Sequence, residues 1–225
     1  MKFTMRQRRG FTLIELLVVI VIIGILAVMI GANWKNMILW SQRSSTLNNM
    51  RQVGIAVYNY AGDNNSLLPR RVVGTNDGDK WPKLLSAYLD DVRVYAATGD
   101  RSNYIFQGKD PLDNHRNYTS YIMNGYNDVG AFTNPQVEVR LSQLEKPASV
   151  ILFGTPNPGS THFYMDLLEA PHGNQNDVLN LTNYGNGSDY IFADGSARFI
   201  TQAEYLREGG TQLWLVDKGF SIPTL

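Results

Sequence analysis

The sequence predicts an α+β fold in which one long N-terminal helix packs on a small antiparallel β-sheet. The first observation is an uncharged apolar segment, Leu16 to Ala32, followed by apolar residues at helical spacing as far as Ala61. The second is the change after Leu67, where prolines, glycines and asparagines separate short apolar runs that are typical of strands in long loops. A chain of 225 residues, 44% of them hydrophobic, is long enough for one such domain with an appendage.

Composition and motifs exclude several classes of protein. Lys plus Arg and Asp plus Glu both number 20, so no net positive field favours nucleic-acid binding. The absence of cysteine excludes disulfides, thiolate metal sites and a cysteine nucleophile. The sequence contains no G-x-S-x-G, H-E-x-x-H, P-loop or G-x-G-x-x-G motif. Its three histidines lack metal-ligand spacing and are expected in loops: His115, His162 and His172. We therefore nominate no catalytic residue, and we expect a protein that is not an enzyme and requires no cofactor.

The first half of the predicted helix is long enough to span a membrane. From Phe11 to Ala32 it has 22 residues, about 33 Å of helix. The leader before it carries four basic residues and no acidic one, so the positive-inside rule predicts a cytoplasmic N-terminus. A plain signal anchor would explain this much. It would not explain Glu15, because an unpaired carboxylate in an apolar segment costs on the order of a few kcal/mol.

The helical pattern continues beyond the membrane segment. One apolar stripe steps by three and four residues: Leu47, Met50, Gly54, Val57 and Ala61. Such a stripe predicts a face that docks on a sheet. Gly62 and the polar residues after it predict the end of the helix. We therefore expect one helix from about Phe11 to Ala61.

The strands and short helices are predicted from residue 67 onward. The clearest element is a hairpin at residues 189–200, in which Asp194-Gly195 favours a two-residue type I′ turn. Three aromatic side chains of this hairpin are expected to face the helix: Tyr190, Phe192 and Phe199. Two further strands are expected at residues 149–154 and 161–165. Residues 81–89 and 141–145 are expected to form a short helix and a single helical turn.

The N-terminal segment resembles the type IV pilin and type II secretion pseudopilin superfamily. The residues that carry the resemblance are Arg9 to Glu15, read as RGFTLIE, and the apolar run that follows. The resemblance implies that an inner-membrane prepilin peptidase cuts between Gly10 and Phe11 and methylates the new N-terminal Phe11. It also implies that Glu15 is the carboxylate used in assembly, and that the fold is pilin-like. The proline that many members carry near the end of the apolar run is absent.

The C-terminal part is similar to a narrower pseudopilin-like family that has a histidine upstream of an Asp-Gly pair. The matching pieces are residues 81–89, 120–126 and 145–154, His172-Gly173, and FADGSARFI with Asp194-Gly195. The spacing from His172 to Asp194 is longer than in that family. The cysteine-proline pair of the family, expected near VYAATGD, is also absent.

Three acidic residues near the C-terminus are candidate calcium ligands: Asp177, Asp189 and Asp194. Several pseudopilins bind calcium in a loop of this region, and Ca²⁺ prefers carboxylate and carbonyl oxygens. Turn chemistry at Asp194 and solvated loops at the other two residues explain the same pattern without a metal.

The sequence as a whole predicts a pseudopilin of a type II secretion system. Residues 1–10 would be the cytoplasmic leader, 11–62 the helix for membrane spanning and assembly, and 63–225 the periplasmic β-rich domain. The expected partners are prepilin peptidase, further copies and other pseudopilins in a filament, and an inner-membrane assembly platform. The precursor would span the inner membrane once, before it enters a periplasmic pseudopilus. The alternatives are a type IV pilus subunit for adhesion, motility or DNA uptake, and a membrane-anchored periplasmic binding module or hydrolase.

Overall fold

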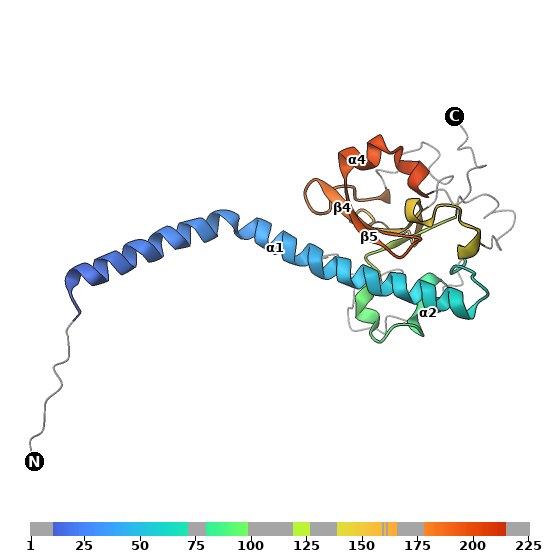
Figure 1. Ribbon diagram of the computed structural model, residues 1–225, viewed down its shortest axis with the longest axis horizontal. Coiled ribbons are helices and arrows are strands. Elements are labelled where there is room, and N and C mark those ends of the chain that lie inside the picture. The colour runs from blue at the N-terminus through green and yellow to red at the C-terminus, as the bar shows by residue number, and fades with distance from the viewer. Residues whose placement is uncertain are drawn as a thin grey trace, which may run out of the picture. The chain divides into compact units, whose positions relative to one another are not determined.

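The computed structural model describes residues 11–71, 80–98, 119–126, 139–158, 160, 162–165 and 178–214. It confirms the predicted α+β class, because the described chain consists of one long helix and a mostly antiparallel five-stranded sheet with short helices (Figure 1). The chain divides into two compact units, residues 1–41 and 42–225. The C-terminal half of the long helix therefore belongs to the same unit as the sheet.

Helix α1 runs from Leu13 to Asp63, within two residues of the predicted bounds. Its N-terminal part has apolar residues on every side, and its later part has the apolar stripe expected from the sequence. The helix ends where Asn65 and Ser66 adopt positive φ angles of 54° and 66°. The Ser66 backbone nitrogen donates to the carbonyl of Ala61 at 2.8 Å, which satisfies one of the last carbonyls of the helix.

The five strands lie in the order β3-β1-β2-β4-β5. Their bounds are β1 Ile122–Asn124, β2 Ile151–Gly154, β3 Tyr164–Met165, β4 Gly187–Phe192 and β5 Ala197–Thr201. All neighbours pair antiparallel except β1 and β3, which are parallel. Strands were predicted at 149–154 and 161–165, and the structure has β2 and β3 within those ranges. β1 was not predicted, because its three residues are too few to show a pattern.

The C-terminal half of α1 packs on one face of the sheet. The residues that the helix buries there are Met50, Val53, Ala56 and Val57, in one cluster with Met123, Phe153 and Ile191 of the strands. A Cβ atom added at Gly54 would lie 3.2 Å from Cγ2 of Ile191, so the glycine permits close approach of helix and sheet. The predicted stripe is thus confirmed, although Leu47 is only half-buried.

Short helices complete this first core. Helix α2, Trp81–Ser86, and the 3₁₀ turn η2, Val92–Tyr95, bring Trp81 and Tyr95 into it, and the two rings meet edge to face at 5.4 Å. The indole nitrogen of Trp81 donates to the carbonyl of Phe163 at 3.0 Å. The 3₁₀ turns η3, Leu141–Gln143, and η4, Pro147–Ser149, precede β2. The helical turns predicted at 81–89 and 141–145 are therefore confirmed over shorter spans.

The opposite face of the sheet has its own core. It is covered by α4, Gln202–Arg207, and the 3₁₀ helix η5, Gly210–Trp214, which place Tyr205 and Trp214 against the strands (Figure 1). The indole nitrogen of Trp214 donates to the hydroxyl of Tyr205 at 2.9 Å. Neither α4 nor η5 was predicted. Both faces of the sheet are thus buried, which explains why β4 is buried at all six residues and lacks a polar alternation.

Two predictions about the hairpin are wrong. Tyr190 and Phe192 belong to the core on the face away from α1, because successive side chains of a strand alternate and Ile191 takes the helix side. Phe199 does face α1, where the Arg43 guanidinium lies 4.0 Å from its ring centre.

The turn of the hairpin also differs. Ala193, Asp194 and Gly195 form a three-residue loop, and the φ angle of Gly195 is 79°, whereas that of Asp194 is not positive. A type I′ turn requires positive φ at both central residues.

Candidate functional site

The first turn of α1 contains a capping box formed by Thr12 and Glu15. Thr12 lies immediately before the helix, which begins at Leu13. Its backbone nitrogen and its hydroxyl both donate to Oε2 of Glu15, at 2.8 and 2.7 Å. In return, the backbone nitrogen of Glu15 donates to Oγ1 of Thr12 at 3.3 Å. The two side chains therefore satisfy amides that the start of a helix leaves without partners.

The capping box adds a structural role to Glu15 that the sequence analysis missed. The spacing T-x-x-E at residues 12–15 is the ordinary sequence signal for this motif. A cap needs only an acceptor oxygen, so glutamine can replace glutamate in it, whereas an ion pair with an amine needs the charge. Both hydrogen bonds from Thr12 end on Oε2, so Oε1 takes no part in the capping box.

Phe11, the residue expected to follow the cut, precedes α1 and is 77% exposed. Its amide is therefore not held in the hydrogen-bond ladder of the helix. Gly10, on the other side of the predicted cut, lies outside the described residues. The cut, the N-methylation of Phe11 and the assembly role of Glu15 stay predictions.

The helix that follows has the length and composition of a membrane span. Residues Leu13–Gly31 have a mean hydropathy of 3.3, and none of this segment is buried by the rest of the structure. Its large side chains are exposed on all sides of the helix, from 43% at Val19 to 85% at Leu13. A helix that is apolar all round requires a non-aqueous environment or other helices around it.

The three candidate calcium ligands have different surroundings. Asp189 is fully buried in β4 on the side of α1, and Asp194 is exposed in the hairpin loop. Asp194 Oδ1 accepts from the backbone nitrogen and hydroxyl of Ser196 at 2.9 and 2.6 Å. Partial burial acts to raise the pKa of Asp194, but the Ser196 hydrogen bonds hold it below its ordinary value. Asp177 lies outside the described residues. Among the described residues, no group of three His, Cys, Asp or Glu side chains is placed to hold a metal ion, and calcium binding stays a prediction.

Asp189 forms an ion pair with Arg43 of α1. The Arg43 Nε atom lies 3.2 Å from Asp189 Oδ1, and the guanidinium stacks over Phe199 of β5. Burial raises the pKa of Asp189, while the Arg43 hydrogen bond and the charges of Arg43 and Arg51 oppose the rise. The pair joins residues 146 positions apart, so no local pattern in the sequence could have revealed it. It ties α1 to the hairpin.

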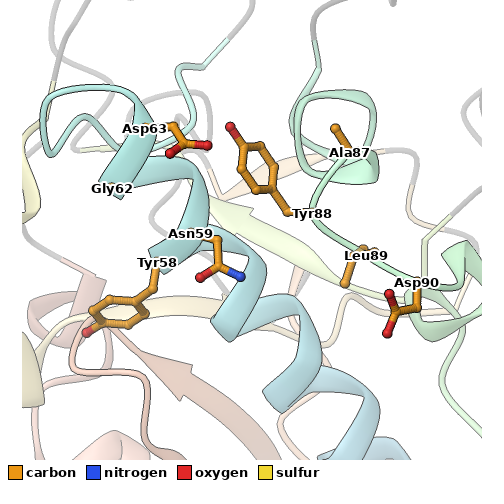
Figure 2. Close-up of a pocket in the computed structure, with 8 residues that line it drawn as sticks. All are labelled: Tyr58, Asn59, Gly62, Asp63, Ala87, Tyr88, Leu89 and Asp90. Carbon is orange, nitrogen blue, oxygen red and sulfur yellow. The ribbon is translucent and has the colours of Figure 1, made fainter.

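A groove of about 570 Å³ lies between the end of α1 and the segment after α2. Figure 2 shows its lining: Tyr58, Asn59, Gly62 and Asp63 of the helix, and Ala87, Tyr88, Leu89 and Asp90 opposite. Asp63 and Tyr88 point toward each other across it (Figure 2). Burial and the nearby Asp63 raise the pKa of Tyr88. The lining has two carboxylates and no histidine, serine or basic residue, so it does not form a nucleophile with an adjacent base.

Comparison with known proteins gives a match at the N-terminal segment. Residues 5–31 match the family model described as the prokaryotic N-terminal methylation motif. No curated protein and no solved structure matches the chain. The motif implies processing by prepilin peptidase, and together with the apolar helix it indicates anchoring in the inner membrane before assembly. The N-terminal segment thus carries the prepilin-type methylation motif that marks the type IV pilin and pseudopilin superfamily.

Proposed function

We propose that the chain is a pseudopilin, a structural subunit of the periplasmic filament of a type II secretion system. The observation that carries the proposal is a methylation motif that includes the start of a helix, where residues 13–31 are exposed and, apart from Glu15, without charge. Residues 42–225, in contrast, form a compact unit that covers both faces of its own sheet. Such a chain keeps one hydrophobic surface for a membrane and later for other subunits, and it uses no catalytic site.

Assembly would move the exposed helix from lipid into contact with other helices. In the membrane, acyl chains surround the side chains of residues 13–31; in the filament, the same helices of neighbouring subunits do so. Cleavage after Gly10 creates a new α-amine at Phe11, four residues before Glu15. We propose that the Glu15 carboxylate pairs with the Phe11 amine of a neighbouring subunit. The pair neutralises both charges in apolar surroundings and sets the axial position of each incoming subunit.

The capping box makes a sharp test of this pairing possible. Glu15→Gln keeps an acceptor for Thr12 and removes the negative charge, whereas Thr12→Val keeps the charge and removes the hydroxyl. We expect Glu15→Gln to be processed and inserted normally but to form no filaments. We expect Thr12→Val to form them. Filaments are measured by shearing or cross-linking and immunoblotting, and processing by the change in mass. Normal assembly of Glu15→Gln would contradict the registering role.

The choice of a secretion system over a pilus rests on the similarity of the C-terminal part to pseudopilin-like sequences. A type IV pilus subunit remains the alternative, since both use the same N-terminal motif. Genes for a secretion ATPase and an outer-membrane secretin beside this gene, and loss of a secreted protein on its deletion, would support the secretion role. Loss of surface pili with unchanged secretion would overturn it.

A further inference from the structure

The exposed apolar surface of α1 extends beyond the membrane span. Five large side chains between Trp34 and Trp40 are 39–67% exposed: Trp34, Met37, Ile38, Leu39 and Trp40. We call this group the apolar collar. All five lie on α1 within the first compact unit, residues 1–41.

Two charged residues define where the collar lies relative to a bilayer. Glu15 and Lys35 are the nearest charges on either side of the apolar run, and the residues between them carry none. They are 20 residues apart, which corresponds to about 30 Å of helix, the thickness of a bilayer hydrocarbon core. With both charges at the two boundaries of the hydrocarbon core, Trp34 lies at the outer boundary. Trp40 then lies about 8 Å beyond Lys35, near the outer limit of the headgroup layer.

The collar has the chemistry of a membrane interface. Tryptophan combines a large apolar ring with one N–H donor and is enriched at the level of lipid headgroups. Lys35, between the two tryptophans, has a long side chain that can extend its ammonium group to the polar headgroup level. The first polar run after the collar, Ser41 to Ser45, begins at the distance where the headgroup layer ends.

We propose that the apolar collar is an interfacial anchor that inserts into the headgroup layer of the outer leaflet and sets the depth of α1. This rests on the inner-membrane anchoring in the proposed function. The anchor holds Glu15 at the inner boundary, at the depth where a neighbour's Phe11 amine would also lie. It must be withdrawn from the lipid when a subunit enters a filament.

The experiment uses tryptophan fluorescence of the full-length protein in phosphatidylcholine–phosphatidylglycerol vesicles. The lipids carry bromine, a quencher, either near the headgroup or near the end of the acyl chain. Trp81 and Trp214 are fully buried within the folded unit, so lipid quenchers should reach only Trp34 and Trp40, two of the four tryptophans. We expect shallow bromine to quench up to about half of the emission and deep bromine to quench much less.

Tryptophan variants show which residues give the quenching, and vesicle flotation separates the interfacial anchor from membrane anchoring as such. Trp34→Phe and Trp40→Phe should each remove part of the shallow quenching, and the double variant should remove nearly all of it. Vesicle flotation is measured on the same samples. Stronger quenching by deep bromine overturns the collar as an interfacial anchor, as does floating protein that shallow bromine does not quench. If the protein floats but shallow bromine does not quench it, the protein is diluted with lipid and its tryptophan emission is measured again. A shift of that emission on dilution means that a second copy of the chain covers the collar. Protein that does not float overturns membrane anchoring itself.

Discussion

Removal of the Arg43 guanidinium should destabilise the folded unit, because it leaves the Asp189 carboxylate buried without its cation. The Asp189 side chain is fully buried and that of Arg43 is 21% exposed. Loss of one partner of a fully buried ion pair costs about 3–5 kcal/mol, and water around Arg43 reduces this cost. We expect Arg43→Met to lower the free energy of unfolding by about 2 kcal/mol at neutral pH. Methionine keeps an apolar chain over Phe199, so most of this loss reports the charge.

The pH dependence separates lost charge from lost packing. Burial raises the pKa of Asp189, and Arg43 opposes the rise. An acid with a higher pKa in the folded state binds more protons there. Its contribution therefore makes stability fall as pH rises from its unfolded pKa through its folded pKa. Arg43→Met removes the guanidinium that opposes the rise in the pKa of Asp189. The pH range over which stability falls therefore extends to higher pH. The variant should be close to the parent at about pH 4 and lose stability progressively toward about pH 7.

The assay is denaturant unfolding of the full-length protein in mild detergent, followed by near-ultraviolet circular dichroism. This signal reports the buried aromatic residues of the folded unit, such as Trp81 and Trp214. Asp189→Asn is the matched control, since it removes the titrating group. When Arg43→Met is added to Asp189→Asn, it should lower the free energy of unfolding only slightly, and this loss should not vary with pH. An equal loss for Arg43→Met at both ends of the pH range would refute the reasoning and assign the effect to packing on Phe199.

Three further predictions concern the folded unit. A fragment of residues 42–225 should be soluble and monomeric by size-exclusion chromatography, because it retains both cores; aggregation would mean that this unit does not fold alone. If the acidic residues bind calcium, melts of this fragment in Ca²⁺ and in chelator should differ, whereas identical melts would remove Asp177, Asp189 and Asp194 as ligands. Gly187→Ala should destabilise the fragment by about 1–3 kcal/mol or more, since its Cβ would lie 2.4 Å from the Ile200 carbonyl oxygen. The control Gly62→Ala meets no atom within 4 Å, and thermal melts should show it to be neutral or up to about 1 kcal/mol more stable.

The long helix and the hairpin could be predicted because their signals are local. Helical spacing from Met50 to Ala61 and the Asp194-Gly195 pair between two apolar runs each lie within a short window of sequence. Thr12 and Glu15 carried an equally local signal for the capping box.

Which side chains of the strands point toward α1 could not be predicted in the same way. Tyr190, Ile191 and Phe192 are all buried, because α1 covers one face of the sheet and the last helical segments cover the other. These last three residues of β4 are all apolar, so hydrophobicity does not identify which of them face the helix. The partner of Asp189 was hidden for another reason, since Arg43 lies in a different element 146 residues away. Only the assembled fold brings these two side chains together.

The most direct test of the central claim, that the chain is a processed filament subunit, is the mass of the protein isolated from its native membranes. We predict a chain that begins at Phe11 and carries one N-methyl group, and we predict that Gly10→Leu accumulates as uncut precursor. A mature N-terminus at any other residue, or normal maturation of Gly10→Leu, would contradict the claim.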